Sequence, residues 1–169
     1  MSRELELKFA VDDLEPVRSK LIGLGAVLAW KGEEENWFFD TSDRRLKASG
    51  RTLRLKRQGS SGNRLTVKAK PSEDARYKLR DEYETAVDDI PTVTAILENL
   101  GFGESFRYVK NREHWELDGM AIEMDTLNGM AFVEIEGDEP KIDELAGILG
   151  LDFGRSTVKS YPQILEEGV

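Results

Sequence analysis

Apolar and polar residues alternate in eight segments of the chain, and this period of two predicts eight β-strands. The segments cover residues 3–10, 26–40, 51–58, 63–71, 79–87, 105–117, 120–128 and 131–137. In the first segment, three apolar residues alternate with three charged ones: Leu5, Leu7 and Phe9 with Glu4, Glu6 and Lys8. Because successive strand residues point to opposite faces, one face is apolar and the other charged. The pairs Asp118-Gly119 and Asn128-Gly129 and the stretch 59–63 predict hairpin turns between antiparallel strands.

A second pattern, with apolar residues at helical spacing, recurs between the strands. Residues 10–25 and 86–101 both begin Ala-Val-Asp-Asp, carry a proline in the presumed first turn and end in Leu-Gly, and residues 138–150 repeat the plan. An aspartate N-cap, an early proline and a final glycine are typical of capped helices. A short last helix is predicted from Ser160, with Gln163 completing a capping box. The two similar halves indicate an internal pseudo-repeat.

Composition narrows the class of protein. The 169 residues are 39% hydrophobic and 34% charged, which fits one domain over 1–169. The net charge of −9 argues against a nucleic acid partner. Without cysteine the chain has neither disulfides nor thiolate metal sites. No apolar run reaches membrane-spanning length, so no membrane partner is expected and the expected location is cytoplasmic.

Charged residues share the alternate face of seven of the predicted strands. They are Glu4, Glu6 and Lys8; Arg54 and Lys56; Lys68 and Lys70; Arg80, Glu82 and Glu84; Lys110 and Arg112; Glu123 and Asp125; and Glu134 and Glu136. A polar face in water explains any one such strand. The helices, however, need the apolar face, so the charged face must look inward or lie open. We therefore expect an α+β fold with a closed eight-stranded antiparallel β-barrel and helices packed on its outside.

Acids and bases mixed on one face indicate a specific chemistry. A carboxylate cluster without nearby histidine or cysteine selects hard cations such as Mg²⁺ or Mn²⁺. Lysine and arginine bind phosphate oxygens. Buried charges are costly unless a partner or ligand compensates them. The pattern thus predicts a triphosphate site in which Glu4 and Glu6 hold the metal and Lys8 reaches the phosphates.

The same residues resemble a known family. ELELK is similar to the E-x-E-x-K signature of the CYTH superfamily, the triphosphate tunnel metalloenzymes. WFFDTSDRRLKASGRTLRLKR, LTVKAKP, RDEYETAVDD, VKNREHW and AFVEIEGDE resemble the later strands of that family in order, and KSYPQIL resembles the tail of its class IV adenylyl cyclase branch. The resemblance implies an eight-stranded tunnel, triphosphate substrates, Mg²⁺ or Mn²⁺ dependence and a homodimer.

The resemblance also implies roles by position. The metal-binding acids are Glu4, Glu6 and Glu134, supported by Glu136 and Asp125, while Glu82 and Glu84 either bind a second metal or partner the bases. The phosphate-binding bases are Lys8, Arg54, Lys56, Lys68, Lys110 and Arg112, with Lys70 and Arg80 as further substrate-binding candidates. Glu6, Lys8, Lys110 and Arg112 are the catalytic candidates. Asn36 and Phe38 stand where cyclase-like members often carry an acid and a tyrosine, which bears on nucleobase recognition.

Three functions fit these residues. A cyclase would convert ATP to cyclic AMP and pyrophosphate, and the tail favours this reading. A triphosphatase would hydrolyse inorganic, thiamine or nucleoside triphosphate with the same residues. A binder of polyphosphate or nucleotide would keep the bases without needing the metal acids. Among the remaining residues, His114 is expected to be structural or solvated, Trp37 and Trp115 to lie in cores, and Tyr161 either to anchor the tail or to approach the site.

Overall fold

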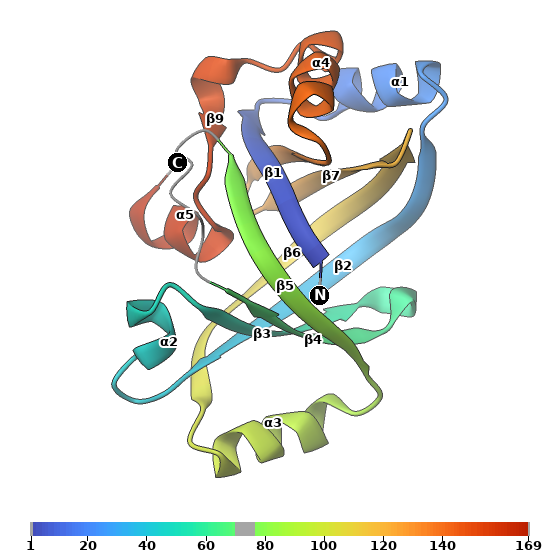
Figure 1. Ribbon diagram of the computed structural model, residues 1–169. Helices are drawn as coiled ribbons and strands as arrows, with labels where there is room; N and C mark the ends of the chain where they lie inside the picture. Colours follow the sequence, from blue (N-terminus) through green and yellow to red (C-terminus); the bar gives the residue numbers. More distant parts are fainter. Residues whose placement is uncertain (1, 70–76, 169) are drawn as a thin grey trace. The chain divides into compact units, whose positions relative to one another are not determined.

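One large antiparallel sheet with nine strands is formed by the part of the chain that the structure describes. This computed structural model describes residues 2–69 and 77–168, apart from the side chains of residues 2–4, 60, 78 and 79. The strands are β1 (Ser2–Val11), β2 (Val27–Asp40), β3 (Thr52–Gln58), β4 (Asn63–Lys68), β5 (Lys78–Val87), β6 (Gly103–Leu117), β7 (Met120–Leu127), β8 (Met130–Glu136) and β9 (Ser156–Thr157). Their order in the sheet is β5-β4-β3-β2-β6-β7-β8-β1-β9, and β5 also pairs with β1 (Figure 1).

The eight predicted strands are all present, with ends that differ by a few residues. The prediction of a closed eight-stranded barrel, however, was wrong, because a ninth strand lies beside β1. Lys8 pairs with Thr157 and Phe9 with Ser156, so at these two residues the neighbour of β1 is the ninth strand, β9, rather than β5. A strand of two residues carries no periodic signal, which explains why the sequence pattern did not predict it.

The helices are α1 (Glu15–Gly23), α2 (Arg45–Ala48), α3 (Ile90–Asn99), α4 (Glu139–Leu149) and α5 (Tyr161–Glu167), with short 3₁₀ turns η1 (Gly59–Ser61) and η2 (Phe153–Arg155). Helix α1 begins at Glu15 with Leu14 as its N-cap, so the predicted aspartate N-cap was wrong there, although Asp13 accepts the backbone N–H of Glu15 at 2.9 Å. The capping box at Ser160 and Gln163 is confirmed. Helix α2 was not predicted: Asp40 accepts the backbone N–H groups of Leu46 and Lys47 at 2.9 and 3.0 Å and so caps this single turn. No helix among the described residues is long and apolar enough to cross a membrane.

Two compact units divide the chain, and each is considered by itself. The described residues of unit 1 fall within Met1–Arg3, Glu33–Ser72 and Arg80–Val109. Those of unit 2 fall within Glu4–Gly32, Glu73–Leu79 and Lys110–Val169.

Each unit has its own apolar core between a sheet face and helices. In unit 1, Ile90 and Leu97 of α3 pack with the strand residues Trp37, Phe39, Leu53 and Leu55. In unit 2, residues of α1 and α4 pack with β1, β7 and β8; they are Val17, Leu21, Ile142, Leu145 and Leu149 against Leu7, Phe9, Ile122, Val133 and Ile135. Helices α1 and α4 lie side by side there (Figure 1). In both units the helices cover the apolar face, as predicted, and the charged residues lie on the other face.

Candidate functional site

Strand register brings the charged residues of unit 2 together. Lys8 of β1 lies opposite Glu134 of β8, and Glu134 lies opposite Glu123 of β7. Arg112 of β6 lies opposite Asp125 of β7. These residues alternate with the apolar ones that face α1 and α4, so they share the opposite face of the sheet. Four strands therefore assemble one mixed charged cluster.

Asp125 is the centre of this cluster. It is completely buried and accepts hydrogen bonds from Arg112, with Nε 2.7 Å from Oδ1 and Nη2 2.6 Å from Oδ2. Lys110 Nζ lies 3.0 Å from Oδ2, and the Tyr161 hydroxyl donates to the same oxygen. Because these donors engage both oxygens, the contacts of Asp125 fit a residue that holds the bases in place. The predicted supporting role at a metal stays a prediction.

Lys8 is nearly buried, with 3% of its surface exposed. Its Nζ lies 3.3 Å from Glu134 Oε1 and donates to the backbone oxygen of Lys159 at 3.0 Å. The same ammonium group lies 3.8 Å from the centroid of the Tyr161 ring, and Lys110 Nζ lies 4.5 Å from that centroid. The C-terminal segment thus contributes to the charged cluster, and burial raises the pKa of the Tyr161 phenol well above its usual range, so the hydroxyl remains a donor.

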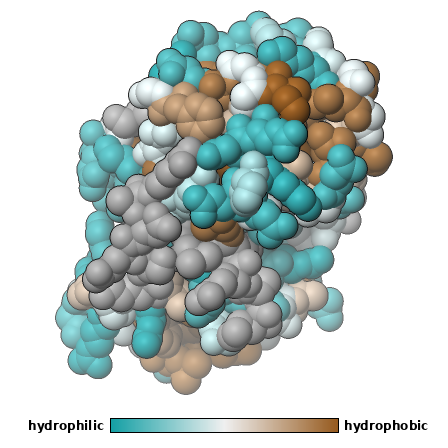
Figure 2. Space-filling model, turned by 45° about the horizontal axis from the view of Figure 1, so that its top comes forward, coloured by the Kyte–Doolittle hydropathy of each residue, from teal (hydrophilic) through white to brown (hydrophobic). Residues whose placement is uncertain are grey.

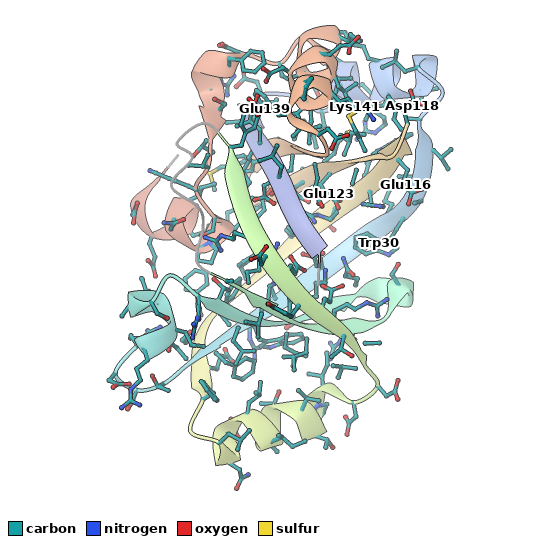
Figure 3. The ribbon with its side chains drawn as sticks, viewed as in Figure 1. Trp30, Glu116, Asp118, Glu123, Glu139 and Lys141 are labelled. Carbon is teal, nitrogen blue, oxygen red and sulfur yellow. The ribbon has the colours of Figure 1, made fainter. Side chains whose placement is uncertain are left out.

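Glu123 links the cluster to the only histidine of the chain. Its Oε1 lies 3.4 Å from Arg112 Nη1 and 2.8 Å from His114 Nδ1. His114 Nε2 also lies 3.6 Å from Glu116 Oε1; Glu123 and Glu116 are labelled in Figure 3. The hydrogen bond to Glu123 raises the pKa of His114, against the effect of burial. His114 is therefore a paired, half-buried residue and not a solvated one.

The predicted metal acids show a suitable chemistry but no ready-made cluster. Glu6 lies opposite Glu136 in the β1–β8 register, and like charges directly opposite each other are unfavourable unless a cation compensates them. Carboxylate oxygens are the ligands that Mg²⁺ and Mn²⁺ prefer. The side chain of Glu4 lies outside the described residues. Among the residues that are described, no three His, Cys, Asp or Glu side chains are grouped closely enough to hold a metal ion.

Unit 1 carries a second charged face, built by β3, β4 and β5. Glu84 lies 3.1 Å from Lys56 Nζ and accepts the Thr66 hydroxyl at 2.8 Å. Lys68 Nζ lies 2.6 Å from Glu82 Oε2. Of the two roles left open for these acids, the contacts fit partners of the bases. Burial, followed by the charge of Arg54, lowers the pKa of Lys56.

Of the remaining predicted bases, the structure describes Arg54 and Arg80. Arg54 on β3 and Arg80 on β5 are half-buried. Lys70 lies outside the described residues. Arg64 was not selected from the sequence, although its Nε lies 3.6 Å from Glu84 Oε1. The same alternation that selected Lys68 on this strand would have found it.

Glu34 on β2 was also missed, whereas Asn36 on the same strand was named only for its bearing on nucleobase recognition. Glu34, with 1% of its surface exposed, accepts Asn36 Nδ2 at 3.0 Å and Gln58 Nε2 at 2.8 Å. These even-numbered residues alternate with the core residues Trp37 and Phe39, so the period of two in residues 26–40 could have revealed them. Trp37 and Trp115 lie in the cores, as predicted.

Three aromatic residues join this face of unit 1. Phe38 stacks on Tyr108 with ring centroids 5.7 Å apart, and it meets Phe106 edge-on at 6.2 Å. Arg54 lies opposite Phe38 in the β2–β3 register. None of the three rings belongs to either apolar core. An aromatic surface next to an arginine suits a planar, anionic ligand.

Comparison with known proteins identifies the family to which the chain belongs. A sequence model of the CYTH domain matches residues 2–152. The chain belongs to the CYTH domain family. A relative from Methanocaldococcus jannaschii, named "putative adenylate cyclase", is 28% identical over 147 residues, which cover 86% of this CYTH chain and 83% of the relative.

Solved structures share the fold of this CYTH chain. One, described as a putative adenylate cyclase from Vibrio parahaemolyticus, has a TM-score of 0.84 and 23% identity, and the match covers 96% of this chain and 97% of that one. Another, from Hippeastrum, is titled a putative adenylyl cyclase with a dominant triphosphatase activity. It has a TM-score of 0.73 and 17% identity over 98% of this chain and 96% of that one.

Proposed function

We propose that this CYTH domain is a metal-dependent enzyme that acts on triphosphates, as an adenylyl cyclase that converts ATP to cyclic AMP and pyrophosphate. The observation that carries the proposal is the pairing of three buried or nearly buried bases with carboxylates on one sheet face of unit 2. Lys8, Lys110 and Arg112 each have a carboxylate oxygen within 3.3 Å. Such pairs keep cations in place in the absence of substrate, and a triphosphate offers them stronger anionic partners.

The bases would act on the charge that develops during the reaction. In cyclisation the 3′-oxygen of the ribose attacks the α-phosphorus, and negative charge grows on the departing pyrophosphate. Lys8 and Lys110 supply point charges, and Arg112 can bind two oxygens at once. Positive groups aimed at the leaving phosphates stabilise the transition state more than the ground state.

The acids that would hold Mg²⁺ or Mn²⁺ are Glu6, Glu134 and Glu136, with Glu4 of the same strand. The opposed pair of Glu6 and Glu136 supports this assignment, because it places carboxylate oxygens, the ligands that Mg²⁺ and Mn²⁺ prefer, on two neighbouring strands. When bound, the metal neutralises phosphate charge and lowers the pKa of the attacking hydroxyl. Unit 1 is considered by itself, and its bases are proposed to contact phosphate with Glu82 and Glu84 as their partners; they are Arg54, Lys56, Lys68, Lys70 and Arg80.

A triphosphatase is the second candidate, because the Hippeastrum structure is titled for that activity. It would use the same bases and acids, with water as the nucleophile at the terminal phosphorus. The aromatic cluster of Phe38, Phe106 and Tyr108, taken within unit 1 alone, suits a ligand with a planar organic group, which ATP has and inorganic tripolyphosphate lacks.

One assay distinguishes these reactions. The purified protein receives ATP or tripolyphosphate with Mg²⁺ or Mn²⁺, and cyclic AMP, pyrophosphate and orthophosphate are all measured. Cyclic AMP with an equal amount of pyrophosphate establishes the cyclase. Orthophosphate without cyclic AMP establishes the triphosphatase. Tight binding of tripolyphosphate without formation of any product would identify the protein as a non-catalytic binder.

The Glu6→Gln variant tests the site itself, because it removes one charge and keeps the shape of the side chain. We expect metal-dependent turnover to fall at least 100-fold while the thermal midpoint stays within a few degrees of the parent value. Glu116→Gln is the matched control, since Glu116 is an exposed strand glutamate outside the proposed metal set. Unchanged turnover in Glu6→Gln would overturn the assignment.

A homodimer is proposed from the family resemblance. Among the described residues of unit 2, seven large apolar ones are exposed: Ile22, Leu24, Val27, Leu28, Ile148, Phe153 and Val158. Figure 2 shows hydrophobic residues among hydrophilic ones on the side that carries α1 and α4. Light scattering of the parent and of an Ile22→Glu variant tests this proposal, with loss of the dimer expected in the variant. The cytoplasmic location stays a prediction.

A further inference from the structure

Tyr161 is buried on the charged face of unit 2, although it opens the last helix of the chain. Only 4% of its surface is exposed. Its hydroxyl donates to Asp125, and its ring packs edge-on against Phe132 with centroids 5.5 Å apart. Two ammonium groups, those of Lys8 and Lys110, lie over this one ring at 3.8 and 4.5 Å from its centroid.

Three separate contacts attach the same tail segment to Lys8. Thr157 pairs with Lys8 in the β1–β9 ladder. The backbone oxygen of Lys159 accepts a hydrogen bond from Lys8 Nζ at 3.0 Å. The ring of Tyr161 then lies against the same ammonium group. The capping box at Ser160 starts α5 directly before Tyr161 and so orients the ring.

Two ammonium groups near one ring repel each other unless something compensates them. Glu134 beside Lys8 and Asp125 beside Lys110 compensate part of this charge, and a further carboxylate would weaken the attraction for an anionic ligand. An aromatic ring attracts cations through its quadrupole and carries no net charge. The Tyr161 ring can therefore hold both lysines in place without adding another negative charge beside them.

We propose that Tyr161 is a positioning residue that holds Lys8 and Lys110 on its ring in the arrangement that binds the phosphates of the substrate. The inference rests on the proposed function, because it assigns phosphate binding to these lysines. On this proposal, residues 156–161 are part of the binding site. The hydroxyl of Tyr161 orients the ring through its hydrogen bond to Asp125.

The test compares Tyr161→Leu, which removes the ring, with Tyr161→Phe, which keeps it. The dissociation constant for tripolyphosphate with Mg²⁺ is measured by calorimetry, and ATP turnover is measured in parallel. Loss of two cation–ring contacts predicts that Tyr161→Leu raises the dissociation constant about 30-fold and also lowers kcat, because misplaced lysines stabilise the departing pyrophosphate less well. Tyr161→Phe should raise it only about threefold, because the ring remains.

Ile164→Ala is the matched control for a loosened tail, since Ile164 is a buried residue of α5 that belongs to no proposed contact. We expect it to lower the thermal midpoint and to leave the dissociation constant within about threefold. If Tyr161→Leu does not fold, progressive fluorination of a phenylalanine at position 161 weakens the ring quadrupole at nearly constant shape, and the dissociation constant should rise stepwise.

Lys8→Met separates failure of this inference from failure of the proposed function. If Lys8→Met weakens tripolyphosphate binding while Tyr161→Leu binds like the parent, the positioning role is overturned and the phosphate site stands. If Ile164→Ala weakens binding as much as Tyr161→Leu, the tail acts as packing only and the inference is again overturned. If the parent itself does not bind tripolyphosphate, the proposed function and the inference fail together.

Discussion

Arg112 binds both carboxylate oxygens of Asp125, with donor–acceptor distances of 2.7 and 2.6 Å. Lys110 shares the same carboxylate, and no surface of Asp125 is exposed. One buried anion therefore compensates two cations on a neighbouring strand. Removing one partner of a buried charge pair is much more costly than removing a surface pair, because the other charge is left uncompensated.

Asp125→Asn is accordingly expected to lower the free energy of unfolding by about 3 kcal/mol. The measurement is urea denaturation with and without Mg²⁺. We expect the same loss in both conditions, because the carboxylate acts on Arg112 and Lys110. Asp138→Asn is the control, since Asp138 is exposed and pairs with Lys141 on the surface. A loss that occurs only in the presence of Mg²⁺ would instead identify Asp125 as a metal ligand.

The hydrogen bond between His114 and Glu123 predicts a raised histidine pKa. Nδ1 lies 2.8 Å from Glu123 Oε1, and this contact outweighs burial. Because the pKa is raised above its ordinary value of 6.5, the stabilisation from this pair is present below about pH 6.5 and is lost as the pH rises through the folded-state pKa. The chain has one histidine, so a single imidazole signal reports the titration in an NMR experiment.

Glu123→Gln should lower the pKa of His114 toward 6.5 in that experiment. Glu116→Gln removes the more distant and exposed partner, whose carboxylate lies 3.6 Å from Nε2, and should have a smaller effect. An imidazole that titrates at or below 6.5 in the parent protein would contradict the ion pair with Glu123.

The lowered pKa of Glu113 predicts that the stability of the fold depends on pH in the acid range. Burial would raise its pKa, but Arg18 and Lys31 lower it from 4.5 to about 2. The folded-state pKa is depressed, so the stabilisation is present above about pH 4.5 and is lost as the pH falls through about 2. Glu113→Gln should therefore cost on the order of 2 kcal/mol at pH 7 and progressively less toward pH 2. Urea denaturation of parent and variant across this pH range measures the difference in their free energy of unfolding. A difference that does not change with pH would contradict the prediction.

Eight strands could be predicted because apolar and polar residues alternate in each of them over at least six residues. The same alternation identified Lys8, Arg112 and Glu134 as residues of one face, since parity alone decides which face a strand residue occupies. Helix α2 and strand β9 could not be predicted this way. They are too short to show a period, and they depend on contacts with Asp40 and with Lys8.

Pairings within the site depend on tertiary geometry. Tyr161 meets Lys8 across more than 150 positions of sequence, and no local pattern encodes that contact. The roles of Glu82 and Glu84 were left open for the same reason. A glutamate that binds a metal and one that partners a lysine are identical in sequence, and only the distances to Lys68 and Lys56 distinguish them.

Lys56 and Glu84 give a last prediction, for the charged face of unit 1. Lys56→Met removes the ammonium group and keeps the apolar stem of the side chain. Tripolyphosphate binding should weaken about tenfold, because the removed charge lies in a poorly solvated place where it interacts strongly with an anion. Glu84→Gln should strengthen binding about threefold, since this carboxylate lies 3.1 Å from Lys56 Nζ and competes with phosphate for it.

Arg57→Met is the matched control, because Arg57 is the next residue of β3, points to the other face and pairs with Glu35 near the surface. Its removal also subtracts one positive charge, so it reports the effect of net charge alone, which salt screens readily. We expect a change below threefold that disappears at high ionic strength. Equal weakening by Lys56→Met and Arg57→Met would mean that unit 1 attracts the anion only through its overall field and that Lys56 makes no direct phosphate contact.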